Sequence, residues 1–94
     1  MRTTEVVVRN PSGIHLRPGA VFVRTAARFT SAITIENVTK GSAMFNAKSM
    51  TDIIKAQART GDTVRLTAEG ADEEAAIAGL EEAIASGLGE QLEA

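Results

Sequence analysis

One histidine and one arginine, two positions apart, are the residues of this chain that could do chemistry together. His15 is the single histidine, and Arg17 and Pro18 follow it closely. A neutral imidazole nitrogen is a competent nucleophile near neutral pH, and a guanidinium offers fixed N–H donors that suit phosphate oxygens. This spacing predicts a site in which the His15 ring carries a phosphoryl group beside Arg17.

The expected backbone around His15 supports that prediction. Pro18 is well tolerated only in the first turn of a helix, so we expect a helix to begin at Leu16. The N–H groups of Leu16 and Arg17 then lack acceptors within the helix, and the helix dipole favours an anion beside them. No carboxylate within a few residues could activate water, which favours holding a phosphoryl group over hydrolysing it. From these residues alone, an ordinary surface or capping histidine stays an alternative.

The rest of the chain must build one small domain that positions this site. Its 94 residues suffice for one hydrophobic core. Alternating and helical patterns follow one another in the order β-α-β-β-α-β-α, at residues 3–9, 16–28, 33–36, 43–47, 49–58, 64–68 and 72–86. This pattern predicts an α+β, open-faced two-layer sandwich, with a four-stranded antiparallel sheet and three helices on one face. We expect residues 1–88 to form the domain and residues 89–94 a short C-terminal tail.

Composition excludes several classes of site and partner. Without cysteine and with a single histidine, the chain cannot form a disulfide framework or an ordinary metal cage, and we expect no metal and no cofactor. No apolar run approaches the roughly 20 residues of a membrane helix, so we expect a cytoplasmic protein without a membrane partner. Basic residues gather in residues 1–59, but the chain lacks Tyr and Trp. It is therefore expected to attract an acidic protein and not nucleic acid.

The predicted first helix is apolar on two sides. One side carries Pro18, Phe22, Ala26 and Phe29, and the other carries Leu16, Ala20, Val23 and Ala27. Only one side can face the sheet, so the second is either a docking surface or covered by the next helix. The residues expected to bind a partner are Leu16, Arg17, Ala20, Val23, Arg24, Ala27, Lys48, Met50, Thr51 and Ile54.

Three segments of the chain match the motifs of one known family. Residues 13–18, Gly-Ile-His-Leu-Arg-Pro, form the first, residues 46–50 the second and residues 68–74 the third. They resemble, in that order, the active-site signature, the regulatory-serine segment and the start of the last helix of HPr. HPr is the histidine-containing phosphocarrier of the bacterial phosphoenolpyruvate-dependent sugar phosphotransferase system. The resemblance covers about residues 3–87.

This resemblance implies a function and a set of partners. It implies that His15 is phosphorylated on Nδ1 by enzyme I and passes the phosphoryl group to enzyme IIA domains in sugar uptake, with Arg17 helping to hold the group. The chain would be a carrier and not an enzyme, and we expect a monomer. Four positions depart from the usual family pattern, and they bear on partner preference: Leu16, Gly19, Thr51 and Asp52.

Ser49 has two interpretations. It precedes a helical pattern and has an acidic residue, Asp52, three positions on, which is typical of an N-cap. In HPr-like proteins that have a serine kinase/phosphorylase, this position is phosphorylated and the product binds a transcriptional regulator. The alternative functions are a non-catalytic HPr-like regulator of carbon or nitrogen control and an unrelated small α/β binding module. A hydrolase is the weakest candidate, because no second nucleophile or base is evident.

Overall fold

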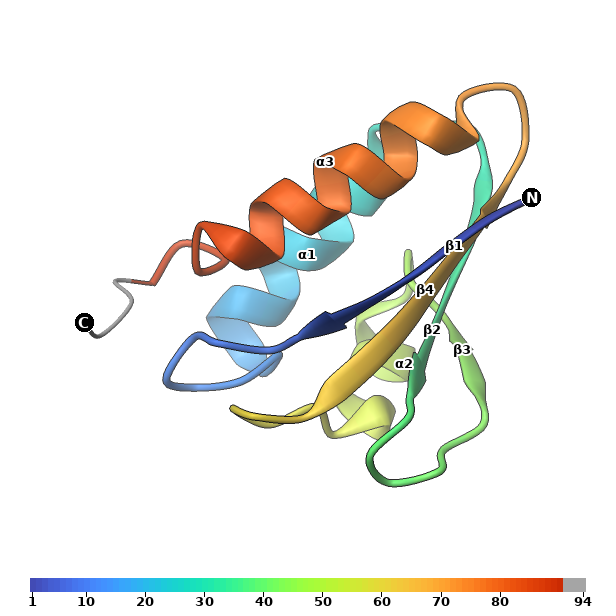
Figure 1. Cartoon of the computed structure of the whole chain (residues 1–94). Coiled ribbons are helices and arrows are strands. Elements are labelled where there is room, and N and C mark those ends of the chain that lie inside the picture. Colours follow the sequence, from blue (N-terminus) through green and yellow to red (C-terminus); the bar gives the residue numbers. More distant parts are fainter. Residues whose placement is uncertain (91–94) are drawn as a thin grey trace.

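The computed structural model describes residues 1–90 and contains the expected order of four strands and three helices. The elements are β1 (Arg2–Val7), α1 (Leu16–Ala27), β2 (Ala32–Asn37), β3 (Met44–Asn46), α2 (Met50–Ala56), β4 (Thr63–Glu69) and α3 (Glu73–Ala85). In Figure 1, α1 and α3 lie side by side across one face of the sheet, and α2 lies beyond α1 against β2 and β3. The predicted open-faced two-layer sandwich is therefore confirmed.

The elements match the predicted ranges to within one residue at most ends, but β1 and α2 each end two residues earlier than predicted. The first strand ends at Val7, because the next residue, Val8, is buried and its N–H donates to the carbonyl of Asp62 instead of continuing the ladder. The second helix ends at Ala56, because Gln57 takes a left-handed conformation with φ 50°. The early end of β1 comes from a contact with the turn that precedes β4, which a local pattern does not contain.

The sheet is antiparallel, with the order β1-β4-β2-β3, so β4 lies between β1 and β2. Arg65 of β4 is in register with Glu5 on one side and Glu36 on the other. Its guanidinium bonds to the carboxylates of Glu5 at 2.8 Å and Glu36 at 3.2 Å. This cross-strand ion pairing occupies the half-exposed polar face that the alternating residues predicted.

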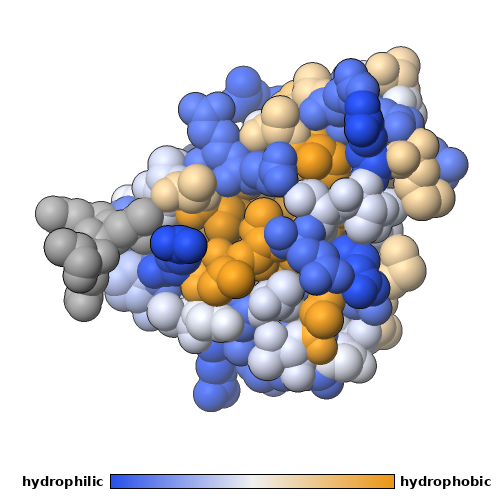
Figure 2. Space-filling view, viewed as in Figure 1, coloured by the Kyte–Doolittle hydropathy of each residue, from blue (hydrophilic) through white to orange (hydrophobic). Residues whose placement is uncertain are grey.

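The core lies between the sheet and the helix layer. Phe22 of α1, Ile35 and Leu66 of the sheet, and Leu80 of α3 are fully buried there. Figure 2 shows apolar side chains that reach the surface on the side that carries α3 and β1, where Val6 and other residues line a shallow groove. None of the helices within residues 1–90 has the length and apolar character to span a membrane.

The packed structure continues past the end of α3. Leu88 is fully buried, and the carboxylate of Glu90 accepts hydrogen bonds from Ser12. The contacts of the domain thus extend at least two residues beyond the expected boundary at residue 88. The remainder of the expected tail, residues 91–94, lies outside the described residues.

Asp72 joins the start of α3 to the start of β2. Its carboxylate accepts the N–H of Thr30 at 2.8 Å, the N–H of Ser31 at 2.9 Å and the Ser31 hydroxyl. These hydrogen bonds, the Ser31 hydroxyl first, lower the pKa of Asp72 from its ordinary value of 3.8 to about 2. The ionised carboxylate therefore stabilises the fold.

We expect Asp72→Asn to destabilise the domain at neutral pH and to have less effect in acid. The folded-state pKa lies below the unfolded one, so the stabilisation is fully present above the unfolded value and is lost as pH falls through about 2. Denaturant unfolding of both proteins should show a constant difference from pH 7 to about 4.5 that shrinks in more acidic solution. A difference that grows on acidification would contradict this assignment.

Candidate functional site

His15 lies at the N-terminus of α1, as the sequence predicts. It is the N-cap residue, with extended backbone angles (φ −111°, ψ −171°), and its exposed ring makes no hydrogen bond within residues 1–90. The N–H groups of Leu16 and Arg17 also find no acceptor within residues 1–90. The Arg17 side chain is exposed and forms no ion pair within that range. A nucleophilic ring and two free amides therefore lie together at a helix start, where an anion is favoured, and the exposed Arg17 side chain belongs to the same first turn.

A short loop sets the position of His15 before the helix begins. Gly13 has φ +66°, and its N–H donates to the Asn10 carbonyl at 3.0 Å. The next residue, Ile14, is buried and donates its N–H to the carbonyl of Ala58 at 2.8 Å. The Thr60 hydroxyl bonds to the carbonyl of Asn10 at 2.6 Å. The loop is therefore fastened to the turn between α2 and β4.

Two polar residues fix that turn in place. The fully buried Asn37 donates from its side chain to the Ala56 carbonyl at 3.0 Å and to Asp62 at 3.1 Å. The Asp62 carboxylate also accepts the N–H of Arg59 at 3.1 Å and pairs with Lys40 at 3.3 Å. These donors, the Arg59 N–H first, lower the pKa of Asp62. The sequence does not predict this network, because its residues are far apart along the chain and carry no motif.

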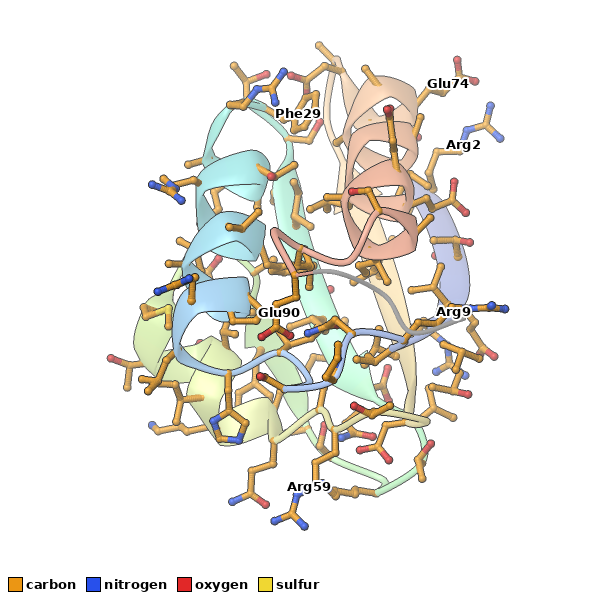
Figure 3. All side chains as sticks on the ribbon, turned by 90° about the vertical axis from the view of Figure 1, so that its left-hand side faces the viewer. Arg2, Arg9, Phe29, Arg59, Glu74 and Glu90 are labelled. Carbon is orange, nitrogen blue, oxygen red and sulfur yellow. The ribbon has the colours of Figure 1, made fainter. Side chains whose placement is uncertain are left out.

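The contacts of Glu90 are a second feature that the sequence does not predict. Its carboxylate accepts the Ser12 N–H at 3.0 Å, the Ser12 hydroxyl at 2.7 Å and the Asn10 side-chain N–H at 3.1 Å. Figure 3 shows Glu90 near the middle of the molecule, against the loop that leads into α1, with Arg59 projecting at the bottom. The Ser12 hydroxyl is the main cause of a lowered pKa at Glu90, and the charge of Arg17 contributes. The fold thus brings a carboxylate close to a loop where the local sequence has none.

The predicted partner-binding residues divide into exposed and partly covered ones. Leu16 is 73% exposed and Ile54 40% exposed, so large apolar side chains flank the site on both helices. Exposed as well are Arg17, Arg24, Ala27 and Thr51, whereas the half-buried residues are Ala20, Val23, Lys48 and Met50. Val23 packs against the core. The second apolar side is therefore exposed at its ends and partly covered near its middle, and its role as a docking surface stays a prediction.

Two of the half-buried residues have structural contacts of their own. A Cβ at Gly19 would lie 3.0 Å from the Met50 Cε atom, so the glycine permits a close approach of α1 and α2. The Lys48 ammonium donates to the carbonyl of Phe29 at 2.7 Å, near the end of α1. Lys48 therefore links two segments of the fold, in addition to its predicted role at the partner surface.

Ser49 caps α2, which confirms one of its two interpretations. Its hydroxyl oxygen accepts the N–H of Asp52 at 3.2 Å, and the Asp52 carboxylate accepts the N–H of Asn46 at 3.0 Å. Phosphorylation of Ser49 stays a prediction. Within residues 1–90, no group of three or more His, Cys, Asp or Glu side chains could hold a metal ion.

Known proteins resemble this chain in both sequence and structure. The family model described as "PTS HPr component phosphorylation site" matches residues 2–86. The multiphosphoryl transfer protein of Escherichia coli O157:H7 is 40% identical over 88 residues, which are 94% of this chain and 23% of that protein. The chain thus spans less than a quarter of the length of this relative.

Solved structures match over nearly the full length. HPr-C-His from Thermoanaerobacter tengcongensis has a TM-score of 0.90 and 40% identity, covering 98% of this chain and 100% of that one. The phosphocarrier protein HPr from Bacillus anthracis has a TM-score of 0.82 and 34% identity, covering 88% and 95%. Since the family model and these folds both span the site at His15, the chain belongs to the HPr family, the phosphocarrier components of the phosphotransferase system.

Proposed function

We propose that this chain accepts a phosphoryl group on His15 from phospho-enzyme I and passes it to enzyme IIA domains during phosphoenolpyruvate-dependent sugar uptake. The observation that carries the proposal is the exposed His15 ring at a helix start where the Leu16 and Arg17 amides are free. The family is one of carriers, so the chain is a substrate of other enzymes and has no turnover of its own. A purely regulatory role would not need a nucleophilic ring at this helix start.

The transfer step uses only groups that surround His15. The Nδ1 lone pair attacks phosphorus, a P–N bond forms, and the bond between phosphorus and the donor atom of enzyme I breaks. The two free amides and the Arg17 guanidinium then stabilise the charge on the phosphoryl oxygens. The same step, reversed toward a new acceptor, delivers the group to a IIA domain. The Glu90 oxygens are occupied by donors from Asn10 and Ser12, which leaves them poorly placed to activate water.

The exposed residues around His15 suit an acidic partner with an apolar centre. Leu16 and Ile54 supply exposed apolar area, and Arg17 and Arg24 supply exposed cations beside it. Phosphorylation of Ser49 by a serine kinase/phosphorylase would add negative charge next to this surface, oppose acidic partners and create a signal for a transcriptional regulator. We place this carrier in the cytoplasm as a monomer.

The direct test is incubation with phosphoenolpyruvate and enzyme I, followed by measurement of intact mass. The chain should gain one acid-labile phosphoryl group, and addition of a IIA domain should remove it. No gain in mass with active enzyme I, shown active on an established HPr, would refute the proposal.

Met50→Asp should weaken binding to enzyme I by about tenfold, because it adds a negative charge to the proposed partner surface, which is expected to meet acidic groups. Met50 is only half-buried, so the free energy of unfolding should fall by only about 1 kcal/mol. Titration calorimetry and thermal unfolding measure the two effects. Met44→Asp is the matched control, since Met44 is 59% exposed on β3 and outside the surface. A loss of several kcal/mol in the free energy of unfolding, or unchanged binding to enzyme I, would show that Met50 is not part of the partner surface.

A further inference from the structure

The segment that follows α3 returns to the loop ahead of α1. Gly87, Leu88 and Gly89 all have positive φ, at 95°, 51° and 85°, and they reverse the chain direction. The Leu88 side chain is fully buried, and its N–H donates to the Ala83 carbonyl at 2.9 Å. This turn, which the buried Leu88 side chain fixes to the core, therefore positions Glu90 against the loop before α1.

We propose that Glu90 is a positioning residue for His15, which holds the loop of residues 10–14 in the conformation that aims the imidazole and the free amides at the incoming phosphoryl group. This inference rests on the proposed function of His15. In this role Glu90 does not contact the phosphoryl group itself.

The hydrogen bonds run from Glu90 to the residues just before His15. Both carboxylate oxygens bond to Ser12, one to its N–H at 3.0 Å and one to its hydroxyl at 2.7 Å. The Asn10 side-chain nitrogen donates to Glu90 at 3.1 Å and also to the Gly13 carbonyl. The same buried amide therefore bonds both to Glu90 and to the backbone two residues before His15.

The loop is held from two sides, and Glu90 supplies one of them. On the other side the Ala58 carbonyl accepts the N–H of Ile14 at 2.8 Å, and the Thr60 hydroxyl bonds to the carbonyl of Asn10. Without the Glu90 carboxylate, the Ser12 donors lose their acceptors and one N–H of the fully buried Asn10 is left without a partner. Since an unpaired buried donor is costly, the loop would rearrange to satisfy it, and His15 would move with the loop.

The lowered pKa of Glu90 agrees with this role. Its causes begin with the Ser12 hydroxyl, continue with the Ser12 N–H and the Asn10 side chain, and include the charge of Arg17 only as the last contribution. The carboxylate is thus stabilised mainly by the loop itself. A positioning role needs acceptor oxygens, whereas an electrostatic role through Arg17 would need the negative charge.

Two variants separate these roles. Glu90→Ala removes the acceptors and the charge, and Glu90→Gln removes the charge but keeps an oxygen for the Ser12 N–H and an amide that can donate to the Ser12 hydroxyl oxygen. Glu82→Ala is the matched control, because Glu82 is an exposed carboxylate of α3 that forms no side-chain hydrogen bond within residues 1–90. The rate of phosphoryl transfer from enzyme I is measured against the concentration of each carrier.

We expect Glu90→Ala to lower kcat by about tenfold with KM changed less than about twofold, because the reacting groups are misaligned while the partner surface on α1 and α2 stays intact. Glu90→Gln should restore most of kcat, and Glu82→Ala should match the unsubstituted chain. Amide hydrogen exchange should quicken at Ser12 and Gly13 in Glu90→Ala but not in the core of the sheet.

Several results would overturn the inference. An unchanged kcat in Glu90→Ala would do so, and Glu90→Gln as slow as Glu90→Ala would assign the effect to charge and not to position. Uniformly faster exchange across the sheet would make Glu90 a general stabiliser only. If the unsubstituted chain itself takes no phosphoryl group, the proposed function fails, and unchanged exchange at Ser12 in Glu90→Ala would refute the loop contact separately.

Discussion

His15→Ala should abolish phosphoryl acceptance altogether. The chain has one histidine, and the free N–H groups of the α1 start lie beside it, so no second imidazole could accept the group. The ring is exposed and makes no hydrogen bond within residues 1–90, so stability should change by less than about 0.5 kcal/mol. Intact mass after incubation with phosphoenolpyruvate and enzyme I measures the first effect, and thermal unfolding the second. An acid-labile phosphoryl group on His15→Ala would place the acceptor elsewhere.

Gly13→Ala should damage both the fold and the transfer reaction. A Cβ at Gly13 would lie 2.5 Å from the Ala58 oxygen and 2.9 Å from the Arg59 Cα, and φ is +66°. Backbone atoms cannot move aside as a flexible side chain can, so the loop must leave the Ala58 turn and take Ile14 and His15 with it. We expect a stability loss of roughly 2–4 kcal/mol and transfer slower by at least about tenfold. Denaturant unfolding and single-turnover transfer from enzyme I measure these losses.

Gly41 provides the control for that substitution. It has nearly the same backbone conformation, φ +64°, in the turn between β2 and β3, but a Cβ there would meet no atom within 4 Å. Gly41→Ala should therefore cost only about 1 kcal/mol of conformational strain and leave transfer unaffected. If both alanine variants lose equal stability and both transfer normally, the close contact at Gly13 is not needed for phosphoryl transfer.

The fold could be predicted from the sequence because its periodicities are strong and local. Ile33 and Ile35 alternate with polar residues, and Ile77, Leu80 and Ile84 follow helical spacing, so each buried face is visible without knowledge of its neighbours. The strand order was not predictable in the same way. It depends on which strands pair across the sheet, and that pairing brings β4 between two strands far from it in sequence.

The site was predictable only where it is built from consecutive residues. His15, Leu16 and Arg17 share one helix start, so residue types and spacing were enough to place the ring, the two amides and the guanidinium. The supports of the loop come from Asn37, Asp62 and Glu90, whose roles depend on tertiary contacts across much of the chain. Nothing in their local sequence separates them from ordinary surface polar residues.

The central place of β4 has a consequence for a chain that is still being synthesised. Until residues 63–69 emerge from the ribosome, β1 has no partner in the sheet, and the β2–β3 hairpin pairs on one side only. The carbonyls of Ala58 and Asp62, which accept the N–H groups of Ile14 and Val8, also lie just before β4 in the sequence. His15 therefore leaves the ribosome before its surroundings exist. On the proposed function, a nascent or truncated chain that ends before β4 should neither accept a phosphoryl group nor compete with the folded carrier for enzyme I.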